Sequence, residues 1–189
     1  MEPLGIIAFS LLSKHAMRLS MFFRLKSQAI RLAVGTNRIN MMVCLTCGLE
    51  LVLDYQIGDG RVIWRIEQKK IVWPKVRGLS MMECISRIIR VIHSNYIDYL
   101  SVSELPRYDV FNLLGSLPTI REVSVSSSMP ATAVVQVLRV VLLKTSELNL
   151  YPTDQLTNME KFQEILIANL DVINIGRDFG GRFSFRMIF

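Results

Sequence analysis

The residues best suited to chemistry are two cysteines separated by two positions, Cys44 and Cys47. A thiol pair of this spacing can supply half of a tetrahedral zinc site or form a redox-active disulfide. A zinc site needs two further ligands, and only Cys84, His15 and His93 remain, none of which forms a second closely spaced pair. The neighbouring residues alternate as in a strand, where side chains three apart point to opposite faces. We therefore expect no metal and no cofactor, and interpret these cysteines as packing residues.

Other sequence patterns of catalysis are missing. The chain has no nucleophile elbow, no glycine-rich phosphate loop and no zinc-protease helix motif. Gly58-Asp59-Gly60 is more typical of a hairpin turn than of a phosphate cradle. We predict a protein that is not an enzyme, although a triad assembled from distant residues would leave no such pattern.

The charge of the 189-residue chain is uneven. The net charge is +6, with +8 in residues 1–90 and −2 in the remainder. A basic half can indicate a nucleic-acid partner or an acidic protein partner. Most of these basic residues stand singly, which favours an ordinary solvated surface, and a basic nucleic-acid-binding module is the alternative.

Residues near the N-terminus bear on localisation. The uncharged run Pro3–Ser13 is far shorter than the ~20 residues that span a bilayer. Glu2 and Pro3 stand where a secretory signal would carry basic residues. Three cysteines do not make the even, dense set of a disulfide framework. We expect a soluble protein of the cytoplasm, the nucleus or both, without a membrane partner.

The elements that would position functional residues are organised around Ile120–Val125. This stretch alternates apolar and polar residues, as a strand with one buried face does. The same pattern recurs 25 residues later at Glu147–Leu150, 25 residues later again at Asp171–Ile175, and 23 residues earlier at Tyr99–Val102. Such a period is typical of leucine-rich-repeat-like arrays, in which parallel strands line a binding face. Polar positions that alternate with the apolar ones are the candidate target-binding residues: Glu122, Ser124, Glu147, Asn149 and Asn174.

The other elements are assigned by apolar period. Residues 2–23 predict one helix, or two helices broken at Ser13, with an apolar stripe of Ile6, Phe9, Leu12, Ala16 and Leu19. Four alternating runs predict an antiparallel meander that ends near Trp73-Pro74, with Arg31, Glu50, Asp54, Arg61, Arg65 and Glu67 on its solvent side. Ser80 and Thr157 open capping boxes. The first predicted helix of the second half is Ser80–Tyr96, with Met82, Ile85, Ile89, Ile92 and Tyr96 on its apolar stripe and Arg87 off it. Pro106–Gly115 is a short helix or an irregular return, and Pro130–Lys144 and Thr157–Ala168 are further predicted helices. The predicted fold therefore mixes helices and strands (α/β, of the α+β type), with N-terminal helices, an antiparallel meander and strand–helix repeats with parallel strands.

A resemblance to a known family covers most of the chain. The segment from Glu2-Pro3 through Ser13-Lys14 to Leu19 resembles the second half of an F-box, in the form found in the large nematode F-box family. Later motifs resemble the same family and its F-box-associated domain of the second type: Ile30-Arg31-Leu32, Asn37-Arg38-Ile39, Trp64, Gly115–Pro118 and Asn169–Asp171. The expected domains are partial F-box helices at 1–25, a β-meander at 26–75, the associated repeat domain at 76–178 and an atypical tail at 179–189.

The resemblance implies a function. It implies a substrate-receptor subunit of a Skp–cullin–F-box ubiquitin ligase, which binds a Skp-type adaptor and a target protein and performs no bond chemistry itself. By position, the implied adaptor-binding residues are Pro3, Leu4, Ile7, Phe9, Leu11 and Leu12. Because the F-box is partial, a family member without adaptor binding is a further alternative.

Overall fold

The computed structural model describes residues 2–56, 61–66, 69–73, 79–104, 110–126, 128–150, 172–175 and 185–188. The chain divides into two compact units, the first comprising residues 1–32 and 37–96 and the second comprising residues 33–36 and 97–189. The main boundary thus lies at residues 96–97, whereas the sequence indicates one at residues 75–76. The fold is of the α+β class, with helices and both parallel and antiparallel strands.

The first unit begins with two short helices, α1 (Pro3–Ser10) and α2 (Lys14–Met21). Pro3 occupies the first turn of α1, where its missing N–H is not needed. Ser13 is the N-cap of α2, and its side chain accepts a hydrogen bond from the Ala16 N–H at 3.0 Å. The buried Ser20 hydroxyl donates to the Ile6 carbonyl at 3.1 Å, which ties the two helices together. The break at Ser13 is therefore real.

This break changes which residues of the predicted stripe are buried. Leu12 falls in the turn between the helices and is 66% exposed, and Leu19 is also exposed. Met17 and Leu11 are buried instead. A single helix would have kept Leu12 and Leu19 on one face, but the turn at residues 11–13 resets the helical phase.

The antiparallel meander follows, with strands in the order β1 (Ser27–Val34), β2 (Arg38–Leu45), β3 (Glu50–Gln56), β4 (Arg61–Ile66) and β5 (Lys69–Trp73). The register pairs Met41 with Leu53 and Leu53 with Trp64. These three side chains are fully buried, as the alternation predicts. Four strands are confirmed, and β5 is an additional strand, antiparallel to β4, that the sequence does not predict.

One residue expected on the solvent side of the meander is buried. Asp54 is 4% exposed, and its carboxylate lies 3.6 Å from the Arg65 guanidinium. Arg31, Glu50, Arg61 and Arg65 are exposed, as expected. The ion pair lowers the cost of burying the Asp54 charge.

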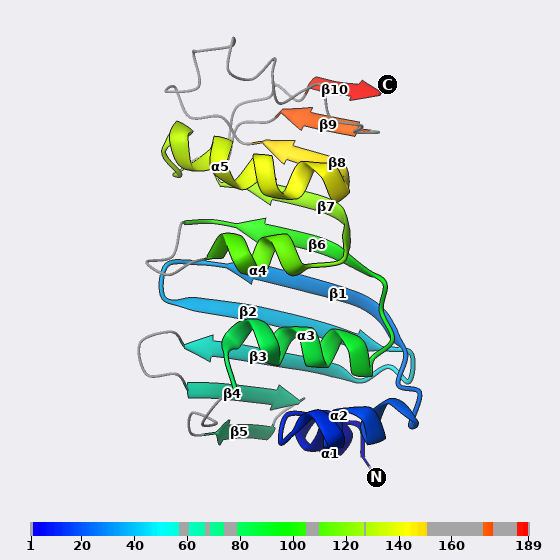
Figure 1. Ribbon diagram of the computed structural model, residues 1–189. Coiled ribbons are helices and arrows are strands. Elements are labelled where there is room, and N and C mark those ends of the chain that lie inside the picture. Colours follow the sequence, from blue (N-terminus) through cyan, green and yellow to red (C-terminus); the bar gives the residue numbers. More distant parts are fainter. Residues whose placement is uncertain are drawn as a thin grey trace. The chain divides into compact units, whose positions relative to one another are not determined.

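Helix α3 (Met81–Val91) covers one face of the meander (Figure 1). Ser80 caps it, with its hydroxyl oxygen accepting from the Glu83 N–H at 3.1 Å. The Glu83 carboxylate binds Arg87 at 2.7 Å, so only the serine half of the predicted capping box is used. Arg87 is buried and Met82 and Tyr96 are exposed, which corrects the predicted stripe. Arg87 can be buried because its guanidinium also donates to the Leu11 carbonyl at 3.1 Å.

The second unit contains the strands β6 (Tyr96–Val102), β7 (Thr119–Val125), β8 (Thr145–Leu150), β9 (Val172–Ile175) and β10 (Phe185–Ile188), in that spatial order. Strands β7, β8 and β9 are parallel, and the register pairs Val123 with Leu148 and Leu148 with Ile173. This is the 25-residue step of the sequence. Strand β10 is antiparallel to β9, so part of the predicted tail forms a strand that does not continue the parallel series.

Helices α4 (Val110–Ser116) and α5 (Ala131–Val141) lie on one face of these strands, and α5 continues as the short helix η1 (Leu142–Lys144) (Figure 1). The Lys144 ammonium donates to the carbonyl oxygens of Leu114, Gly115 and Leu117 at 2.6, 2.8 and 3.0 Å. It therefore closes the C-terminal end of α4. Burial lowers the pKa of Lys144, while the three acceptors stabilise its charge.

Two of the repeats bury three positions with the same spacing. Ile97, Leu100 and Val102 are fully buried in and around β6, and Ile120, Val123 and Val125 repeat the pattern in β7. The predicted helix at Thr157–Ala168 and the turn at Gly58-Asp59-Gly60 lie outside the described residues.

Candidate protein-interaction surfaces

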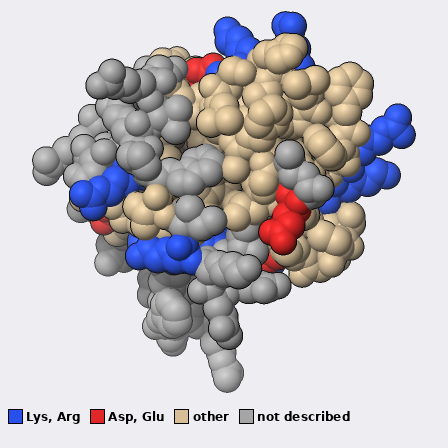
Figure 2. Space-filling model, turned by 90° about the horizontal axis from the view of Figure 1, so that it is seen from below, with Lys and Arg blue, Asp and Glu red and all other residues tan. Residues whose placement is uncertain are grey.

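Exposed apolar side chains gather at the N-terminal helices. Eight large apolar side chains of the described residues are exposed, and four of them lie between residues 12 and 23: Leu12, Leu19, Phe22 and Phe23. We call these four residues the N-terminal apolar surface. Phe22 is 80% exposed, and it lies three residues after Leu19, within one helical turn. Figure 2 shows the side of the molecule at which α1 and α2 lie, where a broad uncharged area is bordered by lysine and arginine side chains and by a few acidic ones.

The residues implied for adaptor binding differ in how exposed their side chains are. Ile7 and Leu11 are 0% and 1% exposed, so they belong to the core of the first unit and cannot contact a partner while it stays folded. The other implied residues of α1 are half-buried: Pro3, Leu4 and Phe9. Leu12 is the most accessible of the implied residues.

The polar positions of the repeat strands form a second surface. The register aligns Glu122 with Glu147, and Ser124 with Asn149 and Asn174. Since alternate residues of a strand share a face, these five residues, which we call the polar ladder, lie on one face of β7–β9. Val123 and Leu148 occupy the alternate positions and are fully buried. The register thus makes these five positions neighbours across the three strands, and their role in target binding stays a prediction.

Within the polar ladder the side chains differ in accessibility. The Asn149 amide donates a hydrogen bond to the Glu122 carboxylate across the two strands. Glu122, Glu147 and Asn149 are half-buried, whereas Ser124 is 6% exposed and is therefore not accessible to a target. Two carboxylates at paired positions make this face acidic, and the amide of Asn149 offsets part of their repulsion.

The chemistry-bearing residues of the sequence are dispersed. Cys44 lies in β2, Cys47 is exposed in the turn that Gly48 closes with a φ of 82°, and Cys84 is buried in α3. Burial raises the pKa of the Cys84 thiol to about 12. His15 is exposed, and His93 donates from Nε2 to the Met21 carbonyl at 3.0 Å. In the described part of the chain, no three His, Cys, Asp or Glu residues cluster as metal ligands would.

Sequence reasoning missed part of the N-terminal apolar surface. Leu19 lies on the predicted buried stripe, and the sequence patterns indicate no role for Phe22 and Phe23. The signal that could have identified this surface is the aromatic pair Phe22-Phe23, which lies beyond the last residue of the predicted apolar stripe.

Comparisons with protein-family models, curated proteins and solved structures find no match to this chain. Among the described residues, every helix is too short or too polar to cross a lipid bilayer.

Proposed function

We propose that this protein is a non-enzymatic substrate-receptor subunit of a Skp–cullin–F-box ubiquitin ligase. In this proposal the N-terminal apolar surface binds the Skp-type adaptor, and the polar ladder binds the target protein. The resemblance of residues 2–19 to an F-box suggests the class, and the arrangement of exposed side chains supports it.

The concentration of exposed apolar residues carries the proposal. Half of the large exposed apolar side chains of the described residues lie in one short segment, residues 12–23. Exposed apolar side chains cost little singly, but several on one short segment can together form a protein interface. The aromatic Phe22 and Phe23 can each bury a large area on binding.

The burial of Ile7 and Leu11 refines which residues would make the contact. Both side chains are in the core, and they hold α1 against the rest of the unit. The adaptor would therefore be bound by Leu12, Leu19, Phe22 and Phe23. This set overlaps the implied F-box residues only at Leu12.

Co-purification with a Skp-type adaptor tests the proposal. Leu12→Asp and Phe22→Asp place a charge in the proposed interface, and loss of a central apolar contact costs about 2 kcal/mol, or about thirtyfold in affinity. The matched control is Leu143→Asp, because Leu143 is 91% exposed and lies in the second unit. Equal binding by all three variants would contradict the proposed interface, as would absence of binding by the unmodified chain.

The polar ladder is tested separately by affinity capture and mass spectrometry. Glu122→Gln combined with Glu147→Gln removes the acidic charge of this face without changing side-chain size. Glu2→Gln combined with Glu50→Gln, two exposed residues of the first unit, removes the same charge elsewhere. A protein that is captured by the unmodified chain and the control but lost from the ladder variant would be the target.

A further inference from the structure

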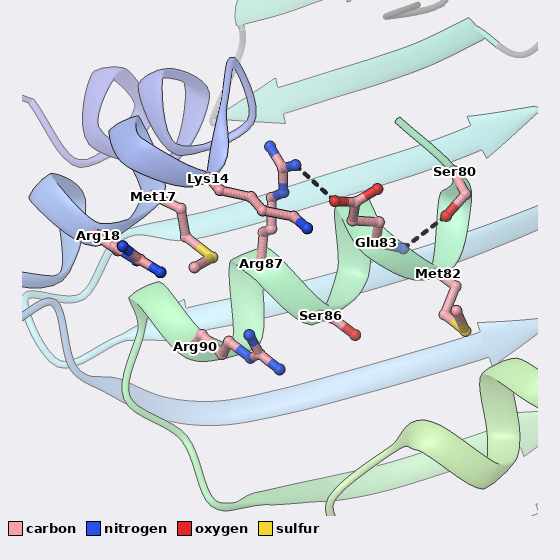
Figure 3. A pocket seen from close by; sticks show the side chains of 9 residues that line it. All are labelled: Lys14, Met17, Arg18, Ser80, Met82, Glu83, Ser86, Arg87 and Arg90. Atoms are coloured by element: carbon pink, nitrogen blue, oxygen red, sulfur yellow. Dashed lines mark hydrogen bonds and ion pairs between the residues drawn. The ribbon is translucent and has the colours of Figure 1, made fainter. Parts of the chain in front are cut away.

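A basic cavity lies between α2 and α3, entirely within the first unit (Figure 3). Its volume is about 440 Å³, which falls in the range of pockets that hold small ligands. Lys14 and Arg18 reach it from α2, and Arg87 and Arg90 reach it from α3. None of the residues of the N-terminal apolar surface or the polar ladder lines it, so it is a separate site.

The charges around this cavity are not balanced. Among the described residues, its lining holds four cationic side chains and one carboxylate, that of Glu83. Glu83 is already bound to Arg87 at 2.7 Å. Lys14, Arg18 and Arg90 are exposed, and none of them makes a hydrogen bond or ion pair with the described residues. The cavity therefore presents three cations that form no ion pair with any described carboxylate.

The two helices that carry these cations are held in place. The Arg87 guanidinium donates to the Leu11 carbonyl at 3.1 Å, and His93 donates to the Met21 carbonyl at 3.0 Å. Both bonds join α3 and its C-terminal turn to the ends of α1 and α2. A ligand bridging α2 and α3 would thus meet a preorganised site and would not have to order the helices. Met17, which is buried, supplies an apolar wall.

We infer that this cavity binds a phosphate monoester dianion. Two guanidinium groups from different helices and one ammonium suit the oxygens of a phosphate, because arginine can donate two parallel hydrogen bonds to it. The hydroxyls of Ser80 and Ser86 line the same cavity and add donors. Nucleic acid fits less well, because the described lining residues include no aromatic side chain on which a base could stack.

Fluorescence anisotropy on the full chain tests the inference. The probe is a labelled short alanine peptide with one central phosphoserine, and the same peptide without phosphate is its reference. The variant Arg18→Gln with Arg90→Gln removes two of the three unpaired cations, and we expect it to weaken binding by about tenfold or more. The control, Arg31→Gln with Arg38→Gln, makes the same charge change at two exposed strand positions of the same unit. We expect the control to change binding less than about twofold.

Competition identifies the source of the phosphate. If inorganic phosphate or O-phosphoserine displaces the labelled peptide at the same concentration as the unlabelled phosphopeptide does, the ligand is a free phosphorylated small molecule. Displacement only by the phosphopeptide would assign a phosphorylated protein segment. The inference is overturned if the phosphorylated and unphosphorylated peptides bind alike, if both double variants weaken binding equally, or if single-stranded RNA binds this site and the phosphopeptide does not. Circular dichroism of each variant establishes that its fold is retained.

Discussion

The buried Arg87 offers the most direct test of how the N-terminal helices are attached. Its side chain is 10% exposed and connects α3 to the Leu11 carbonyl in the turn between α1 and α2. Replacing it by methionine keeps most of the aliphatic length and removes the guanidinium. The Leu11 carbonyl then loses its charged donor within a buried turn.

The expected cost follows from these contacts. A hydrogen bond from a charged donor contributes about 1.5–3 kcal/mol, and a buried acceptor without a partner carries a similar penalty. Glu83 is 33% exposed on its side chain, so water replaces much of what it loses. We expect Arg87→Met to lower the free energy of unfolding by about 2–3 kcal/mol. With an m-value of about 2–3 kcal/mol per molar urea, the midpoint falls by about 1 M.

Urea unfolding followed by circular dichroism measures this change, and Glu83→Gln completes a double-mutant cycle. Because the Glu83 pair is partly solvated, Glu83→Gln alone should cost less than about 1 kcal/mol. Hydrogen exchange should also accelerate in α1 and α2 of the Arg87→Met protein. A loss below about 0.5 kcal/mol for Arg87→Met, or an equal loss for Glu83→Gln, would refute the view that the Leu11 bond anchors these helices.

Three further predictions concern single side chains. Lys144→Met should lower the free energy of unfolding by about 1.5–3 kcal/mol in thermal or urea unfolding, because three carbonyl acceptors of the α4 end lose their donor; an unchanged midpoint would argue against this cap. Because the pKa of Cys84 is raised to about 12 in the fold, its contribution to stability is complete below its ordinary pKa of 9.0 and is lost as the pH rises towards 12. Between pH 8 and pH 10 the stability advantage of the unmodified chain over Cys84→Ala should shrink by about 1.4 kcal/mol, and a constant difference would contradict the assignment. Iodoacetamide should modify the exposed Cys47 in the folded protein and reach Cys84 only on unfolding, as peptide mapping would establish.

The strands could be predicted because their signals are local or strictly periodic. In β2 and β3 the two-residue spacing of apolar side chains predicts buried residues such as Met41 and Leu53, but it does not predict the burial of Asp54. In β7 and β8 the constant 25-residue step predicts which residues lie side by side, and the register confirms it for Val123 and Leu148. The grouping of the polar ladder follows from the same step.

Features that depend on tertiary contacts could not be predicted in this way. Strand β5 begins with two lysines and is followed by a proline, a pattern that predicts the end of a sheet. Its strand conformation depends on pairing with β4. Arg87 resembles a solvent-facing residue in its own helix, and its burial depends on a carbonyl 76 positions away. The same contact joins α3 to the N-terminal helices, and both belong to the first unit, which ends at residue 96.

The equal spacing of β7, β8 and β9 has a consequence for how this chain can change in length. A tandem duplication of one 25-residue segment would insert a strand and its connecting helix while leaving every later side chain facing as before. A one-residue slip in the pairing of the added strand would instead turn its alternation over, so that glutamates entered the interior and valines met water. The second unit can therefore lengthen by whole strand–helix repeats, and each added repeat would extend its acidic face by one strand.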